Sequence, residues 1–285
     1  MSAAPVTEKT VSLKYFMESQ TLRTARKAAE KAKEVITWYD SNRSSLNIGL
    51  KGKNDLVTQA DEAAENEIIK VINEAFPHDD ILAEESASET TLTDRRTWII
   101  DPIDGTTNFA HGVPIYCVSI AMWENRQPQT ALILEVNRDE WYTAEAGRGA
   151  WLNGKKISVS NISKPGESLL ATGFPYRDLG LLDAYLELFK VFMHETQGVR
   201  RPGSAAFDLC LVAAGRCDGF FEYGLSPWDV AAGSLLIREA GGVVTDWTGG
   251  DDWLMGRRIV TGNARIHPYQ LQKIREIIPA KYLKA

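Results

Sequence analysis

Cysteine is scarce in this sequence, and long apolar runs are absent. The three cysteines, Cys117, Cys210 and Cys217, are odd in number and form no C-x-x-C pair. Their apolar neighbours predict buried, reduced thiols, and neither a disulfide framework nor a reactive nucleophile. The first twenty residues hold no continuous apolar segment, and no stretch approaches the length of a membrane span. These absences predict a cytoplasmic protein without membrane contact.

The sequence also lacks the usual features of nucleic-acid and nucleotide binding. A formal charge of −6 argues against a broad nucleic-acid surface. There is no Walker A sequence, no strand-linked G-x-G-x-x-G and no H-E-x-x-H zinc motif. An apolar content of 44% and a charged content of 25% are typical of soluble globular proteins. The 285 residues are enough for one large domain or two smaller ones.

The most informative segment is an apolar strand that ends in two carboxylates. Trp98–Ile100 is followed by Asp101 and Asp104, three positions apart. Pro102, between them, fixes φ and has no N–H, which stiffens the turn and leaves a carbonyl such as that of Ile103 available as a ligand. Carboxylate and carbonyl oxygens favour Mg²⁺, Mn²⁺ or Ca²⁺ over zinc.

The residues after Asp104 suit an oxyanion. Gly105 permits the backbone to reverse, and Thr106 and Thr107 add hydroxyls and amides. An alternative is an ordinary polar turn, since Asp, Pro and Gly all favour turns. This segment alone does not decide between a metal site and a turn.

Two further acidic segments favour the metal site. Glu84 and Glu85 end a short apolar stretch, and Asp229 stands at the start of a predicted helix. If Glu84, Asp101, Asp104 and Asp229 gather without a cation, each pair at about 4 Å costs roughly 4 kcal/mol at an effective dielectric of about 20. The pattern therefore predicts bound metal, with two or more ions.

Periodic apolar residues predict two helices near the N-terminus. Leu22, Ala25 and Ala29 begin a stripe that predicts a helix over 21–39. Thr58 is placed to cap a second helix, with Asp61 in its first turn and a proline at 77 as its end. Asp61 either interacts only with the helix dipole or belongs to the site.

The remaining pattern predicts an α+β protein. An Asn153-Gly154 hairpin lies within a series of antiparallel strands, expected at 118–123, 130–136, 141–144, 149–152 and 157–159. Strands then alternate with helices: strands at 169–172, 219–222 and 243–245, helices at 184–193, 204–214 and 229–240. We expect a loose extension at 1–18, an N-terminal subdomain at 19–162 and a C-terminal subdomain at 163–285, packed as one catalytic unit.

Taken in order, these segments resemble the inositol monophosphatase family, and most closely its bacterial inositol-1-monophosphatases. The resemblance is carried by five segments: 53–61, Glu84-Glu85, 98–109, 203–206 and 228–242. It implies a layered α-β-α-β-α sandwich and an active site with two to three Mg²⁺ ions. It also implies a homodimer and sensitivity to lithium.

The resemblance assigns the metal ligands. Glu84, Asp101 and the Ile103 carbonyl would hold the first Mg²⁺. Asp101, Asp104 and Asp229 would hold the second, with Asp101 bridging the two ions. Glu84 would also have a catalytic role, because it would position a third, more hydrated ion.

The resemblance also assigns the catalytic and substrate contacts. Asp61 and Thr106 would orient the attacking water, and the amides of Gly105 and Thr106 would hold phosphate oxygens. Residues around the sugar-like ring would be Asp104, Gly203, Ser204, Ala205, Glu222 and Asp229. A surface carboxylate at a strand end is the alternative for Glu222. Ser204 stands where animal relatives commonly have Thr.

The function implied is Mg²⁺-dependent hydrolysis of myo-inositol monophosphate, a small phosphorylated polyol. Alternative substrates are fructose 1,6-bisphosphate, NADP and histidinol phosphate. Relatives that act on phosphorylated adenosine nucleotides tend to carry Lys at the position of Thr107, which disfavours that substrate class. An alternative of another class is a regulatory protein that contacts the transcription machinery, as some bacterial relatives do.

Overall fold

The computed structural model describes residues 18–43, 48–52, 55–86, 92–176 and 178–284. The extension predicted at 1–18 lies outside these residues except for Glu18, whose Oε1 accepts a hydrogen bond from Arg26 Nη2 at 2.6 Å. Among the described residues, no helix is long and apolar enough to cross a membrane.

A seven-stranded sheet occupies the first half of the chain. Its spatial order follows the sequence, and all neighbours are antiparallel except β3 and β4, which are parallel. Its strands are β3 (Asp80–Ala83), β4 (Thr97–Asp104), β5 (Cys117–Glu124), β6 (Gln127–Glu135), β7 (Glu140–Glu145), β8 (Ala150–Leu152) and β9 (Lys155–Ile157). A separate hairpin pairs β1 (Ile48–Gly52) with β2 (Asp55–Thr58).

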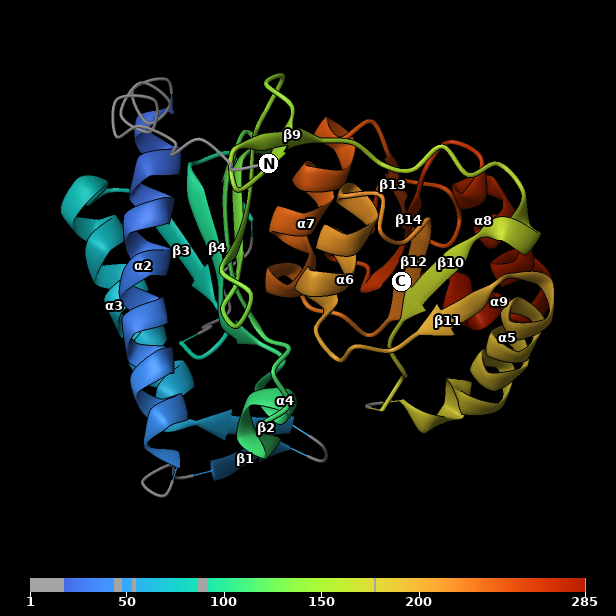
Figure 1. Ribbon diagram of the computed structural model, residues 1–285, viewed down its shortest axis with the longest axis horizontal. Helices are drawn as coiled ribbons and strands as arrows, with labels where there is room; N and C mark the ends of the chain where they lie inside the picture. The colour runs from blue at the N-terminus through green and yellow to red at the C-terminus, as the bar shows by residue number, and fades with distance from the viewer. Residues whose placement is uncertain (1–17, 44–47, 53–54, 87–91, 177, 285) are drawn as a thin grey trace, which may run out of the picture.

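Two helices cover the outer face of this sheet, as Figure 1 shows: α2 (Gln20–Ser41) and α3 (Gln59–Ala75). Both are the helices expected from the periodic stripes. The stripe on α2 is rich in alanine, and its Ala25, Ala28 and Ala29 are fully buried. Small side chains allow α2 to pack closely against α3, β5 and β6, while α3 packs against β4.

A five-stranded sheet forms the second half, in the order β11-β10-β12-β14-β13. The β10–β11 and β10–β12 pairs are parallel, whereas β14 is antiparallel to both its neighbours. The strands are β10 (Leu169–Thr172), β11 (Gly198–Arg200), β12 (Gly219–Tyr223), β13 (Val243–Thr245) and β14 (Arg258–Gly262). On its outer side lie α5 (Leu182–Glu195), α8 (Ile266–Ile277) and α9 (Ala280–Leu283) (Figure 1).

Two helices fill the space between the sheets: α6 (Ala205–Ala213) and α7 (Pro227–Glu239) (Figure 1). Both are buried on nearly all sides, as expected for helices with apolar residues around their whole circumference. They approach closely at Gly233, where a Cβ would lie 2.4 Å from Leu209 Cδ1. The expected α-β-α-β-α sandwich is therefore confirmed.

The structure corrects several predicted boundaries. The Asn153-Gly154 turn is present, with φ of 45° and 72°, but pairing resumes at once between Leu152 and Lys155. A two-residue turn requires this register, so the second strand is β9, at Lys155–Ile157, and the expected strand over 157–159 was wrong. Several elements have no counterpart among the predicted ones, including β14, α8 and the short helix α4 (Thr106–His111). The three cysteines are buried and free, as predicted.

Candidate active site

A β-bulge brings the two aspartates of β4 to the same side of the sheet. Asp101 pairs with Ser119 and Asp104 with Cys117, so β4 has one residue more than β5 in this interval. In a regular strand, residues three apart point to opposite faces. The extra residue in the bulge turns the Asp104 side chain to the same face of the sheet as Asp101. Asp101 and Asp104 therefore both lie beneath α6 and α7, and Ile103 packs in the cluster on the opposite face.

The N-terminus of α6 holds the Asp104 carboxylate. Asp104 Oδ2 accepts hydrogen bonds from Ser204 Oγ and from the Ala206 amide, both at 2.6 Å. Ser204 also caps α6 by accepting a hydrogen bond from the Phe207 amide at 3.3 Å. Burial raises the pKa of Asp104 to about 6, against the effect of the donors from Ser204 and Ala206.

The N-terminus of α7 presents Asp229, the third acid. Asp229 Oδ2 accepts a hydrogen bond from the Ser226 amide at 2.7 Å, which completes a capping box. Pro227 occupies the first turn, where its missing N–H costs no helical hydrogen bond. Ser119 Oγ on β5 donates to the Trp228 carbonyl at 3.2 Å and so fixes the start of α7 against the sheet.

Together these elements form a compact acidic cluster. One carboxylate oxygen from each of Asp101, Asp104 and Asp229 lies within 4.8 Å of the other two. Asp101 is 1% exposed, and its Oδ1 has no hydrogen-bond partner among the described residues. Burial raises the pKa of Asp101 well above its usual range, and the neighbouring charge of Glu84 raises it further.

The donor set fits a hard divalent cation. An isolated buried carboxylate is costly unless it is paired, hydrogen-bonded or bound to metal. The Asp101 Oδ1 atom has the position and chemistry of a metal ligand, and the cluster offers only oxygen. The neighbouring Ile103 carbonyl accepts a hydrogen bond from Thr106 Oγ1 at 3.0 Å. A carbonyl has two lone pairs, so this bond leaves one for an ion.

Glu84 approaches the cluster from β3 but is not one of its three closest members. Its amide donates to the Ile100 carbonyl at 3.1 Å, which places it beside the residue before Asp101. The same turn is fixed by Glu65 of α3, which is buried and accepts a hydrogen bond from the Glu85 amide at 2.8 Å.

Asp61 and Thr106 form a hydrogen-bonded pair next to the acids. Asp61 Oδ2 accepts from the Thr58 amide at 2.8 Å and from Thr58 Oγ1 at 2.6 Å, so the predicted cap of α3 is confirmed as a capping box. Its other oxygen, Oδ1, accepts from Thr106 Oγ1 at 3.0 Å. Burial raises the pKa of Asp61 to about 6, although the Thr58 hydrogen bonds oppose the rise.

Gly105 makes the close approach between α4 and the start of α6 possible. Its φ is +100°, and a Cβ there would lie 3.0 Å from the Ile115 carbonyl oxygen and 3.4 Å from Ser204 Cβ. Asn108 connects the same segments, because its Nδ2 donates to the carbonyls of Ile115 and Pro202, both at 2.9 Å. The acidic motif and the segment around Gly203 are thus held together.

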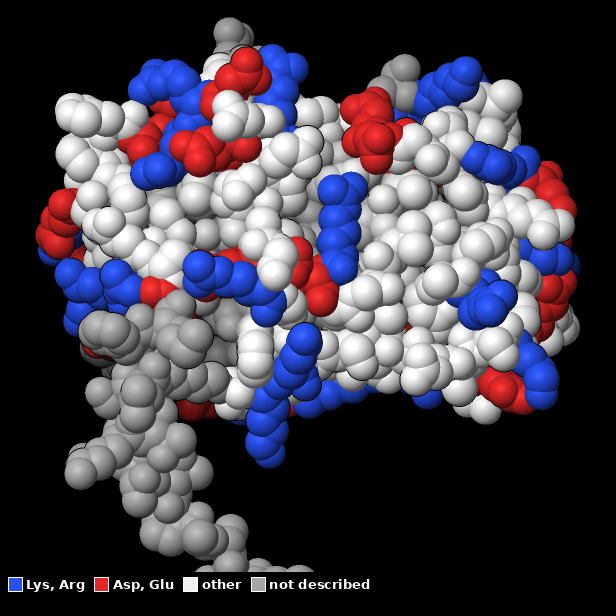
Figure 2. Space-filling model, turned by 90° about the horizontal axis from the view of Figure 1, so that it is seen from above, with Lys and Arg blue, Asp and Glu red and all other residues white. Residues whose placement is uncertain are grey.

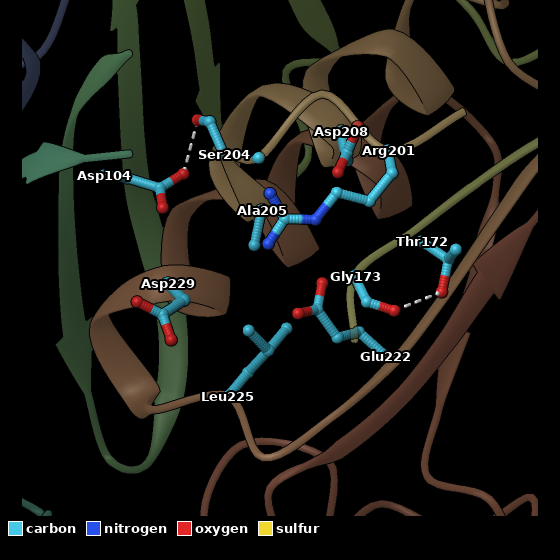
Figure 3. A pocket seen from close by; sticks show the side chains of 11 residues that line it. Asp104, Thr172, Gly173, Arg201, Ser204, Ala205, Asp208, Glu222, Leu225 and Asp229 are labelled. Atoms are coloured by element: carbon cyan, nitrogen blue, oxygen red, sulfur yellow. Dashed lines mark hydrogen bonds between the residues drawn. The ribbon is translucent and has the colours of Figure 1, made fainter. Parts of the chain in front are cut away.

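A pocket opens beside the acidic cluster. It contains every residue expected around the substrate ring, namely Asp104, Gly203, Ser204, Ala205, Glu222 and Asp229. Figure 3 shows Asp104 and Asp229 at one side of it and Glu222 facing them from β12. The pKa of Glu222 is raised to about 8 by burial, against the effect of the nearby Arg201. Gly105 and Thr106 lie outside the lining of this pocket.

Five lining residues were not identified from the sequence: Thr172, Gly173, Arg201, Asp208 and Leu225. Arg201 is exposed, but it also lines the pocket, and its guanidinium carbon lies 5.3 Å from the centre of the Tyr176 ring. Asp208 follows Ser204 by four residues, a spacing that places both on one face of α6. The four-residue spacing could have identified Asp208 from the sequence. Thr172 and Gly173, at the end of β10, come close to the other pocket residues only in the tertiary fold.

Comparison with known proteins agrees with this geometry. The model of the inositol monophosphatase family matches residues 17–279. The Nus factor SuhB of Pseudomonas aeruginosa is 42% identical over 262 residues, which are 90% of this chain and 97% of that protein. The extragenic suppressor protein suhB of Bartonella henselae has a similar structure, with a TM-score of 0.86 and 38% sequence identity. The match covers 91% of this chain and 100% of the Bartonella chain. The structure of the inositol monophosphatase of Anabaena is also similar, with a TM-score of 0.77 and 38% sequence identity. The match covers 95% of this chain and 99% of the Anabaena chain.

Proposed function

This chain belongs to the inositol monophosphatase family, and on that premise we propose that it hydrolyses myo-inositol monophosphate to myo-inositol and phosphate in a Mg²⁺-dependent reaction. The observation that carries the proposal is the acidic cluster, with its unpartnered Asp101 oxygen, beside a pocket whose far wall presents Glu222. The cluster suits a phosphate group and the pocket suits a hydroxyl-rich leaving group.

The proposed ligands are Glu84, Asp101, the Ile103 carbonyl, Asp104 and Asp229. When bound there, Mg²⁺ ions neutralise phosphate charge, acidify water and stabilise a departing alkoxide. Two to three ions are proposed by family resemblance. Ser204 and Ala206 both donate to Asp104 Oδ2, and the other oxygen, Oδ1, is proposed as the atom that binds the ion.

Asp61 and Thr106 are proposed to orient the attacking water. Thr106 Oγ1 has one proton and lies 3.0 Å from both Asp61 Oδ1 and the Ile103 carbonyl. When the proton is donated to Asp61, the hydroxyl oxygen is available to accept a hydrogen bond from water. Because the capping box fixes Asp61, the direction of this acceptor is fixed as well. The amides of Gly105 and Thr106 are proposed to bind phosphate oxygens.

A phosphate-release panel tests the substrate. It contains myo-inositol 1-phosphate, fructose 1,6-bisphosphate, NADP and histidinol phosphate, each with Mg²⁺ and with a chelator. We expect the highest kcat/KM for the inositol ester and no turnover with the chelator. A much higher kcat/KM for another ester would refute the inositol substrate, and turnover in the chelator would refute the metal requirement.

A second candidate function is contact with the transcription machinery. The observation in its favour is the 42% identity to a protein named a Nus factor. On the face shown in Figure 2, however, Lys and Arg of the described residues alternate with Asp and Glu and form no continuous basic surface. Binding to purified RNA polymerase and Nus factors, measured for the parent and for Asp101→Asn, tests this function. Equal binding by both would show an interaction independent of catalysis, and no binding would eliminate it.

The proposal also includes a homodimer, a cytoplasmic location and two subdomains, 19–162 and 163–285, that act as one catalytic unit. Family resemblance supports the dimer. The subdomains correspond to the two sheets, since the strands of the seven-stranded sheet end at residue 157 and those of the five-stranded sheet begin at residue 169. Sedimentation equilibrium at several protein concentrations tests the dimer.

A further inference from the structure

One face of α6 forms a continuous wall of the pocket. Ser204, Ala205 and Asp208 all line it, and their spacing of one and four residues places them on the same side of the helix. Ser204 donates to the metal-site carboxylate of Asp104. Asp208 therefore lies one helical turn farther from the metal cluster, beside the space proposed for the organic part of the substrate.

One oxygen of the buried Asp208 carboxyl lacks a hydrogen-bond partner among the described residues. Asp208 is 1% exposed, and the oxygen without a partner among these residues is Oδ1. A buried polar atom left unpaired costs about 1–3 kcal/mol. Since the carboxyl lines the pocket, a group bound there is available to satisfy it.

A second carboxyl, that of Glu222, faces the same space from the five-stranded sheet. Glu222 reaches the pocket from β12, and Figure 3 shows the Arg201 side chain extending between Asp208 and Glu222. Arg201 contributes one positive charge against two acidic groups. Hydroxyl groups can both donate hydrogen bonds to such carboxyls and accept them from a carboxyl that holds a proton.

We propose that Asp208 is a specificity-determining residue, which together with Glu222 binds hydroxyl groups on the organic part of the substrate. The inference rests on the proposed function and extends it. The pair favours a hydroxyl-rich leaving group over one without hydroxyls, because only the former can satisfy both carboxyls by hydrogen bonds.

The ionisation of the pair agrees with this role. Burial raises the pKa of Asp208 well above its usual range, and the charge of Glu222 raises it further. A carboxyl that keeps its proton both donates and accepts, as neighbouring hydroxyls on a ring require. Arg201 opposes the rise in the pKa of both groups, so it limits how much of the pair is protonated.

The test compares two esters in Asp208→Asn, which keeps the shape of the side chain and removes the carboxyl. We expect KM for myo-inositol 1-phosphate to rise about tenfold, as for the loss of one or two hydrogen bonds, with kcat changed less than about twofold. For p-nitrophenyl phosphate, whose leaving group has no hydroxyl, both constants should stay within about twofold. Asp208→Ser provides a second variant if the Asn protein is unstable.

Asp218→Asn is the matched control. Asp218 is also buried, at 6% exposure, but it binds Ser160 and the Leu169 amide and does not line the pocket. This control should lower the melting temperature without changing the ratio of kcat/KM for the two esters. An unchanged ratio in both Asp208 variants would overturn the proposal, since Oδ1 would then be satisfied by water alone.

The two proposals fail in distinguishable ways. If the parent prefers another polyol phosphate, inositol is the wrong substrate, and the same ratio measured with the preferred ester still decides the role of Asp208. If Asp208→Asn slows both esters equally, the specificity role is wrong while the phosphatase stands. If the parent hydrolyses neither ester, both proposals fail.

Discussion

Gly173 leaves the space that the carboxyl of Glu222 occupies. A Cβ added to Gly173 would lie 1.9 Å from Glu222 Oε1 and 2.4 Å from Oε2, far inside van der Waals contact. Gly173 follows directly after β10, and Glu222 lies on the neighbouring strand β12. The position of the Glu222 carboxyl, which faces the acidic cluster across the pocket, thus depends on the absence of a side chain at Gly173.

Gly173→Ala is therefore expected to displace Glu222. Because the acidic cluster lies on the other side of the pocket, Mg²⁺ affinity should change little, while KM for the polyol ester should rise about tenfold or more. Steady-state kinetics and isothermal titration with Mg²⁺ measure the two effects. Gly166→Ala is the control, since its Cβ would meet nothing closer than 4.0 Å. An unaltered KM would show that Glu222 does not contact the substrate.

Asp101→Asn is expected to abolish turnover and to stabilise the metal-free protein. The variant removes a buried charge whose neighbours are acidic, so its melting temperature in chelator should be a few °C above that of the parent. The loss of a metal ligand should lower kcat/KM by about 10³ or more. Thermal melts with and without Mg²⁺ check both parts. Mg²⁺ affinity equal to that of the parent would remove Asp101 from the ligand set.

Thr106→Ala is expected to lower kcat by about 10² and to leave KM within about twofold, because the hydroxyl acts on water and not on bound substrate. Thr106→Ser keeps the hydroxyl that lies 3.0 Å from Asp61 Oδ1 and should retain most of the activity. Asp61→Asn should resemble the alanine variant. A rise in KM alone would reassign both residues to substrate binding.

The stability of the metal-free protein should fall with rising pH, in part through Glu222. Its pKa is about 8 in the fold and 4.5 for an ordinary glutamate. Between these values the folded state holds a proton that the unfolded state releases, so raising the pH lowers the free energy of unfolding. Glu222→Gln should match the parent at pH 5 and melt a few °C higher at pH 9. Glu187→Gln, an exposed carboxyl on α5, controls for the lost charge; equal pH profiles for parent and Glu222→Gln would contradict the assignment.

Lithium is expected to inhibit the enzyme uncompetitively with respect to substrate. Li⁺ is similar in size to Mg²⁺ but carries half the charge, so in an exchangeable position near Asp101, Asp104 and Asp229 it would hold phosphate product on the enzyme. Initial rates over a matrix of Li⁺, Mg²⁺ and substrate concentrations measure this. Purely substrate-competitive inhibition, or none at high Li⁺, would show that no such exchangeable position exists.

Sequence periodicity was sufficient to predict the helices and strands that bury one face. The stripe on α2 and the turn at Asn153-Gly154 each carry a local signal that the fold preserves. The same local signals could not reveal the short helix α4, because its start depends on the positive φ of Gly105 and its packing depends on a loop some 100 residues away. Strand β14 was not predicted although it is longer than β13, which was, so length does not explain the difference.

For the site, the sequence identified the acids but not their geometry. Two apolar runs that end in acids and one acid at a predicted helix start predicted a metal cluster, and three of its four acids, Asp101, Asp104 and Asp229, have carboxylate oxygens within 4.8 Å of one another. Asp101 and Asp104 point to the same face because β4 has a bulge where it pairs with β5. This bulge depends on the register between the two strands, which the sequence of β4 alone does not reveal. Asp208 and Arg201 were not predicted as pocket residues for a related reason. Their neighbours in the pocket come from β10 and β12, which are distant in sequence.

The hydrogen bonds from α6 to Asp104 also bear on the order in which a newly made chain acquires its activity. Asp104 and Ser204 are 100 residues apart, and Asp229 comes later still. Closing so long a loop costs chain entropy that is recovered only when the second half docks. The first half alone thus has only Asp101 and Asp104 of the three clustered acids. A cation that binds all three acids therefore stabilises only the complete fold, by its free energy of binding. Chelation would weaken first the junction where β4 meets α6 and α7.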